Sequence, residues 1–159
     1  MTAQSIDARA DAAPPGLWFM GAHLTIHLAK ATSAAGISMV EHLMGEGFNV
    51  PLHRHDEDET FFILDGRFRF RIDDTLLELG TGQSLHVPAG AVHAFRVASP
   101  TGRFLTVTTG RFEDMVRALS RPAPSATLPP QVPMTSEEAD RLVDVCAAHG
   151  IQFVGPPIE

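Results

Sequence analysis

The amino-acid sequence predicts an all-β domain of short antiparallel strands, arranged as a sandwich or a barrel. Segments of alternating apolar and polar residues follow one another through residues 17–109, with turn residues between them about every eight to twelve positions. The clearest alternation runs from Arg67 to Ile72, where apolar side chains occupy one face of a strand and three Arg occupy the other. This spacing is typical of antiparallel sandwiches and barrels.

Expected strands fill the central part of the chain, and the two ends differ from it. We expect residues 1–16 to form a flexible arm, residues 17–110 the barrel, and residues 111–159 a helical and proline-rich extension packed on it. The strands are expected at 23–28, 37–44, 59–64, 67–72, 75–79, 84–87, 92–97 and 103–108, with helices at 112–119 and after Thr135. Thr135 and Glu138 have the spacing of a reciprocal helix cap, and Gly150 stands where the helix should end.

Bulk properties exclude several classes of protein. The 159 residues suit one domain, and a net charge of −7 with a single lysine provides no basic surface for nucleic acid. One cysteine permits no intrachain disulfide, and neither a secretion signal nor a long apolar segment is evident. We therefore expect a cytoplasmic protein that binds neither nucleic acid nor membrane.

Two histidine windows carry the chemistry. His53 and His55 are two residues apart, so on a strand both would point to one face, and Glu59 follows after an acidic bend. In the second window Gly90 suits a tight turn, after which His93 begins a strand that could approach the first pair. Three imidazoles and one carboxylate form a mixed nitrogen and oxygen site, which suits one divalent ion such as Fe, Mn, Ni, Co, Cu or Zn better than Ca or Mg.

Both windows resemble the two sequence motifs of the cupin family. The first reads Gly47-x5-His53-x-His55-x3-Glu59-x6-Gly66 and the second Gly82-x5-Pro88-x-Gly90-x2-His93, separated by residues 67–81. Val97 departs from the second motif, where the family often has Asn.

The resemblance covers about residues 17–109 and implies a jelly-roll barrel, the double-stranded β-helix, with the ion inside near one mouth. The chain is most similar to quercetinase-like single-domain cupins, which cleave flavonols with O2. By this analogy Glu59 would be both a metal ligand and the catalytic base.

Several other side chains could line a pocket around the ion. Phe61 and Ile63 share the strand face of Glu59, whereas Phe95 and Val97 share that of His93. They could equally be ordinary barrel filling. The histidines His27 and His42 would join the pocket only if they face inward.

Three kinds of function remain open. The first is a metal-dependent dioxygenase acting on an enol or phenolic, flavonol-like small molecule. The second is a non-redox isomerase or lyase acting on a polar small molecule. The third is a small-molecule-binding cupin without turnover, and for any of them a homodimer formed through sheet edges is expected.

Overall fold

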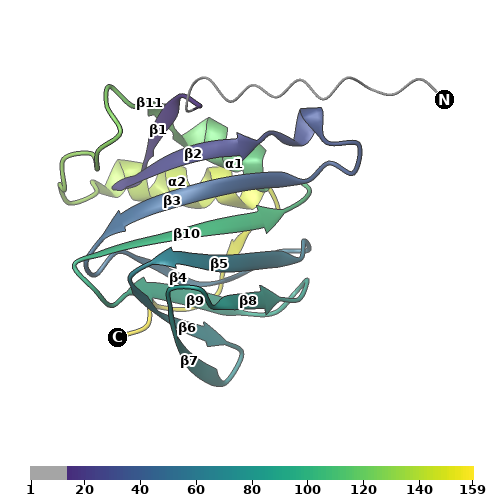
Figure 1. The fold of residues 1–159 in the computed structure, drawn as a ribbon, viewed down its shortest axis with the longest axis vertical. Coiled ribbons are helices and arrows are strands. Elements are labelled where there is room, and N and C mark those ends of the chain that lie inside the picture. Colours follow the sequence, from purple (N-terminus) through teal and green to yellow (C-terminus); the bar gives the residue numbers. More distant parts are fainter. Residues whose placement is uncertain (1–13) are drawn as a thin grey trace.

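The computed structural model describes residues 14–159, and the predicted flexible arm lies mostly outside the described residues. Two antiparallel sheets face each other across the core (Figure 1). This arrangement confirms the predicted all-β jelly-roll fold. None of the helices within residues 14–159 combines the length and the apolar character needed to cross a lipid bilayer.

The larger sheet has seven strands, in the order β11-β1-β2-β3-β10-β5-β8. Its strands are β1 (Gly16–Phe19), β2 (Ala22–Leu28), β3 (Ser38–Gly45), β5 (Glu59–Asp65), β8 (Ser84–Val87), β10 (Thr101–Thr108) and β11 (Arg121–Pro122), and the helical turn η1 (Lys30–Thr32) follows β2. Strand β10 is central, because it pairs with β3 on one side and β5 on the other.

The smaller sheet has five strands, in the order β12-β4-β9-β6-β7. Its strands are β4 (Asn49–Arg54), β6 (Arg67–Ile72), β7 (Thr75–Gly80), β9 (His93–Val97) and β12 (Gln152–Phe153). The alternation of β6 is as predicted: Phe68 and Phe70 are fully buried, whereas Arg67 and Arg69 are exposed and face Glu78 of β7.

A cluster of aromatic rings fills the space between the sheets. Phe61, Phe68, Phe70 and Phe104 are each at most 2% exposed, and neighbouring rings among them lie 5.0–6.2 Å apart with their planes inclined to one another. Inclined aromatic pairs at this separation contribute about 0.5–1.5 kcal/mol each beyond the area that they bury. This packing holds the two sheets in a fixed relation at one end of the barrel.

Two helices follow the last barrel strand, α1 (Phe112–Leu119) and α2 (Ser136–Ala148). Figure 1 shows them together at the end of the molecule where β1, β2 and β11 lie, away from the β6–β7 hairpin. The reciprocal cap predicted for Thr135 and Glu138 is present, and Gly150 has the positive φ of 79° that ends such a helix. Met115, Val116, Cys146 and Ile151 of this extension belong to the buried core.

Candidate metal centre

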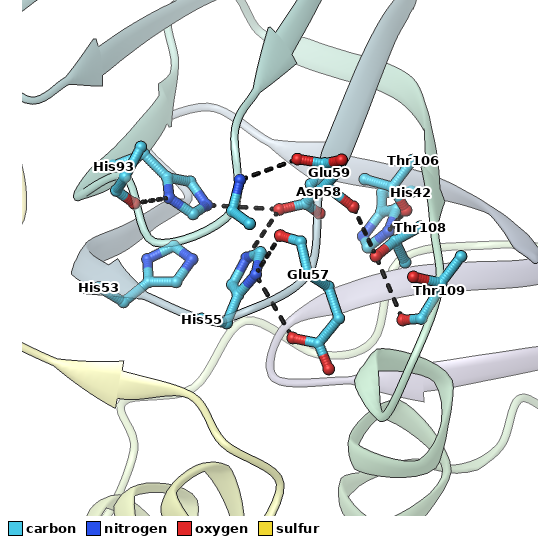
Figure 2. A network of polar contacts seen from close by, with 12 residues as sticks. His42, His53, His55, Glu57, Asp58, Glu59, His93, Thr106, Thr108 and Thr109 are labelled. Atoms are coloured by element: carbon cyan, nitrogen blue, oxygen red, sulfur yellow. Dashed lines mark hydrogen bonds and ion pairs between the residues drawn. The ribbon is translucent and has the colours of Figure 1, made fainter.

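The two histidine windows meet where the two sheets come together. Strand β4 carries His53 and pairs with β9 so that His53 lies directly opposite His93, with ring centroids 4.1 Å apart. Glu59 begins β5 of the other sheet, and His55 lies just beyond the end of β4, in the turn that joins the sheets. Figure 2 shows these four side chains converging from both sheets. All four are at most 8% exposed.

Backbone carbonyls fix the orientation of the three imidazole rings. The Nδ1 atoms of His53, His55 and His93 lie 2.8, 3.0 and 3.0 Å from the carbonyl oxygens of Pro51, Glu57 and Ala91, respectively. A carbonyl oxygen only accepts, so each Nδ1 carries a proton that it donates. In a neutral ring the Nε2 atom then presents a lone pair, which is the arrangement that metal-binding histidines adopt.

The carboxylate of Glu59 completes the cluster. Its Oε2 atom lies 3.2 Å from Nε2 of His55 and 3.3 Å from Nε2 of His93. Burial alone would raise the pKa of Glu59, but the close contacts of its carboxylate with these two imidazoles lower it well below its usual range. Glu59 is therefore an anionic oxygen donor inside the barrel at neutral pH.

The histidines differ in their protonation. Burial lowers the pKa of His53 to about 4, with a further contribution from neighbouring His93, so His53 is neutral at physiological pH. Burial also disfavours the charged form of His55, but the hydrogen bond and negative charge of Glu59 outweigh it and raise the pKa of His55. The carboxylate of Glu59 therefore favours a proton on His55.

The donor set fits a divalent ion. One ring nitrogen from each of the three histidines lies within 4.8 Å of the other two. Nitrogen donors with a carboxylate beside them match the preferences of first-row transition ions. The three-histidine site is thus compatible with a divalent metal, as the motif spacing predicted, without specifying which metal.

Hydrogen bonds between the two motif loops hold the ligand-bearing segments in place. The N–H of Gly90 donates to the carbonyl of His55 at 2.7 Å, and the N–H of Ala89 donates to Oδ1 of Asp58 at 2.8 Å. Asp58 lies in the acidic bend that precedes Glu59. Its hydrogen bond to the second loop is a positioning role that no local pattern could indicate.

A cavity of about 470 Å³ opens beside the cluster. Its wall is mostly apolar and is contributed by both sheets and by the C-terminal extension. The residues that line it include His42, His53, His55, Glu59, Phe61, Phe95, Phe112, Met115, Leu142, Cys146 and Phe153. Such a volume is within the range of small-molecule sites. The helices therefore supply part of the cavity wall, in addition to packing on the barrel.

The six residues expected to surround a pocket divide into two groups. Phe61, Phe95 and His42 line the cavity. Ile63 and Val97 do not; they are 0% and 1% exposed and lie two residues further along their strands, among the barrel filling. His27 is also outside the wall, and its Nε2 atom contacts Oε2 of Glu41 at 2.7 Å on the exposed side of the sheet.

Cys146 lies in the cavity wall as a helix-packing residue. It is 3% exposed, and burial raises the pKa of its thiol to about 11. At neutral pH the group is an unionised thiol, which is a poor nucleophile.

Comparison with known proteins gives consistent matches. Residues 39–108 match the family model described as the cupin domain. Quercetin 2,3-dioxygenase of Bacillus subtilis is 30% identical over 114 residues, which are 69% of this chain and 33% of the relative. The chain thus spans about a third of the length of the curated relative it matches.

Solved structures show the same fold. An RmlC-like cupin from Shewanella frigidimarina aligns with a TM-score of 0.56 at 17% identity, covering 64% of this chain and 89% of that one. A predicted oxalate decarboxylase from Thermotoga maritima aligns with a TM-score of 0.55 at 19% identity, covering 69% and 98%. At these identities the likeness concerns the fold alone.

Proposed function

The chain is a cupin-domain protein, and on this premise we propose that it is a metal-dependent dioxygenase for an enol or phenolic small molecule. One divalent ion would be held by His53, His55, His93 and Glu59. The observation that carries the proposal is the pairing of this donor cluster with a largely apolar cavity at its side. An apolar wall suits an aromatic substrate better than a sugar or a small polar acid.

The chemistry of each component follows from its position. A first-row ion bound here would supply a Lewis acid for an enolate or phenolate oxygen and, if redox-active, a route for electrons to O2. Both histidine contacts of Glu59 involve Oε2, so Oε1 remains to accept the hydroxyl proton of the substrate. Phe61 and Phe95 provide an apolar wall beside the cluster, against which an aromatic ring could pack.

The relative in Bacillus subtilis supports the same reaction class, since it is named as a dioxygenase of a flavonol. The match covers only a third of that protein, so the substrate of this chain is part of the proposal. Expected partners are therefore a small organic molecule and O2. The homodimer, the cytoplasmic location and the three-part division of the chain stay predictions.

The test combines metal analysis with oxygen consumption. Protein purified without chelators should contain about one equivalent of Fe, Mn, Ni, Co or Cu per chain, and His53→Ala should lose it. His27→Ala is the matched control, because it removes a histidine that lies outside the cluster. An oxygen electrode should then record O2 uptake with flavonols or simple enols for the parent and His27→Ala only.

Two results would contradict the proposal. Zinc as the sole bound metal, together with no O2 uptake, would replace the dioxygenase by a non-redox enzyme. Metal retained in full by His53→Ala would remove this histidine from the ligand set.

A further inference from the structure

A second polar site lies in the cavity wall, away from the metal-ligand cluster. His42 on β3 lines the cavity and is 8% exposed. Its Nε2 atom lies 3.1 Å from the hydroxyl oxygen of Thr106, which is on the adjacent strand β10 and is 1% exposed. Figure 2 shows this pair to the right of Glu59, separate from the three clustered histidines on the left.

The surroundings of Thr106 indicate which nitrogen of His42 carries the proton. The Thr106 hydroxyl also lies within 3.4 Å of the carbonyl oxygen of Val40, which can only accept. A hydroxyl has one proton, and donating it to Val40 leaves the oxygen to accept from Nε2–H of His42. The Nδ1 atom of His42 then holds a lone pair.

That lone pair belongs to a side chain in the cavity wall. None of the residues in the described part of the chain forms a hydrogen bond with Nδ1 of His42. The atom is also not fully buried, because His23 Nε2 is the fully buried side-chain atom without a partner among these residues. Two aromatic rings lie close to the His42 ring, with centroid separations of 4.8 Å from Phe104 and 6.2 Å from Phe112. Burial lowers the pKa of His42 to about 4, so the ring is neutral near pH 7.

We propose that His42 anchors the substrate by accepting a hydrogen bond at Nδ1 from a hydroxyl group of the bound molecule. This inference rests on the proposed function and deepens it. The ligand would have an apolar, aromatic body and two polar ends. One end is an ionisable oxygen at the cluster of His53, His55, His93 and Glu59, and the other is a hydroxyl donor directed at β3. A ligand with the first end alone would bind without engaging His42.

Paired ligands test the anchor. Quercetin and 3-hydroxyflavone share the enolic hydroxyl, but only quercetin carries further hydroxyl groups on its outer rings. Calorimetric titration of the metal-loaded protein under anaerobic conditions measures binding without turnover. We expect quercetin to bind about three- to tenfold more tightly than 3-hydroxyflavone, as one neutral hydrogen bond would give.

Variants separate an anchor from a packing residue. His42→Leu should abolish the preference for quercetin, leave 3-hydroxyflavone affinity unchanged and leave the metal content unchanged. His42→Gln, whose amide oxygen can accept, should restore part of the preference. His23→Leu is the matched control: His23 is equally 8% exposed and lies in the same sheet, but outside the cavity wall. It should keep the full preference.

The outcomes are distinguishable. An equal loss of affinity for both ligands in His42→Leu would show a packing role and overturn the anchor. A preference for quercetin that survives the substitution would also overturn it. If the metal-loaded parent binds neither ligand, the proposed substrate class fails, and the anchor with it.

Discussion

The backbone N–H of Gly90 donates a 2.7 Å hydrogen bond to the carbonyl oxygen of His55, which joins the two motif loops directly. Gly90 adopts a φ of 81°, and a methyl group added there would meet no atom within 4 Å. The residue is therefore a glycine for its backbone conformation and not for lack of space. This conformation directs its N–H to the carbonyl oxygen of His55, a candidate metal ligand.

Gly90→Ala should weaken metal binding as well as the fold. A left-handed backbone costs a residue with a Cβ atom about 1–2 kcal/mol, and relief of that strain would move the hydrogen bond to His55. We expect a lower unfolding free energy in chemical denaturation and a several-fold weaker metal affinity.

Gly36→Ala is the matched control for Gly90→Ala, because Gly36 has a φ of 66° and equally open surroundings but lies outside both motifs. It should lose similar stability and no metal affinity. An equal loss of metal affinity in both variants would show that Gly90 acts only through global stability.

Gly16→Ala should destabilise the protein through His23. An added Cβ at Gly16 would lie 2.2 Å from Nε2 of His23, a distance that forces one of the two groups to move. Overpacking of this kind typically costs about 1–3 kcal/mol. Among the described residues, Nε2 of His23 is the buried side-chain polar atom without a hydrogen-bond partner, so the ring has no polar contact there to lose.

A double-mutant cycle with His23→Ala measures this coupling. Removing the imidazole should relieve the clash, so the double variant should be more stable than the sum of the single effects indicates. Strictly additive unfolding free energies would show that Gly16 is required for some other reason.

His42 should make stability depend on pH in a defined window. Its pKa is lowered by burial from 6.5 to about 4, so between these values the unfolded chain binds a proton that the native chain does not. The contribution of this group to the free energy of unfolding is therefore fully present above pH 6.5. It falls as the pH drops towards 4, by up to about 1.4 kcal/mol per pH unit. Comparing denaturation curves of the metal-free parent and metal-free His42→Leu at several pH values isolates the contribution of His42. Parallel pH profiles would mean that His42 is not buried as a neutral ring.

Much of the fold follows from local patterns. The alternation in β6 and the turn residues around it determine which side chains face the core, and pairing with β7 and β9 follows the same parity. The motif spacing likewise predicted that His53 and His93 meet. The odd or even position of a residue in a strand determines which face its side chain is on, but not how far along the barrel it lies. Ile63 and Val97 therefore share a face with cavity residues, yet lie about 7 Å further along, in the filled end.

The contribution of the tail to the cavity could not be read from the sequence. Leu142, Val143 and Cys146 give α2 an apolar stripe, but Val143 is 50% exposed, and an amphipathic stripe does not identify what it packs against. The two-residue strand β12 is similar, because its pairing places Phe153 opposite His53 through a contact between residues far apart in the chain. Such long-range contacts depend on the whole packed structure.

At pH values low enough for His55 to be protonated, metal binding should displace a proton from its ring. The pKa of His55 is raised by Glu59, so below that pKa the ring is protonated and an incoming cation must displace the proton. His53, whose pKa is about 4, and Glu59, whose pKa is lowered, are already in their ligand forms near neutrality. Metal affinity should therefore fall about tenfold per pH unit below the His55 pKa and be insensitive to this group above it. Calorimetric titrations of chelator-treated protein, in buffers of different ionisation enthalpy, count the protons released. A count that does not rise as the pH falls would show that no protonated His55 precedes the metal.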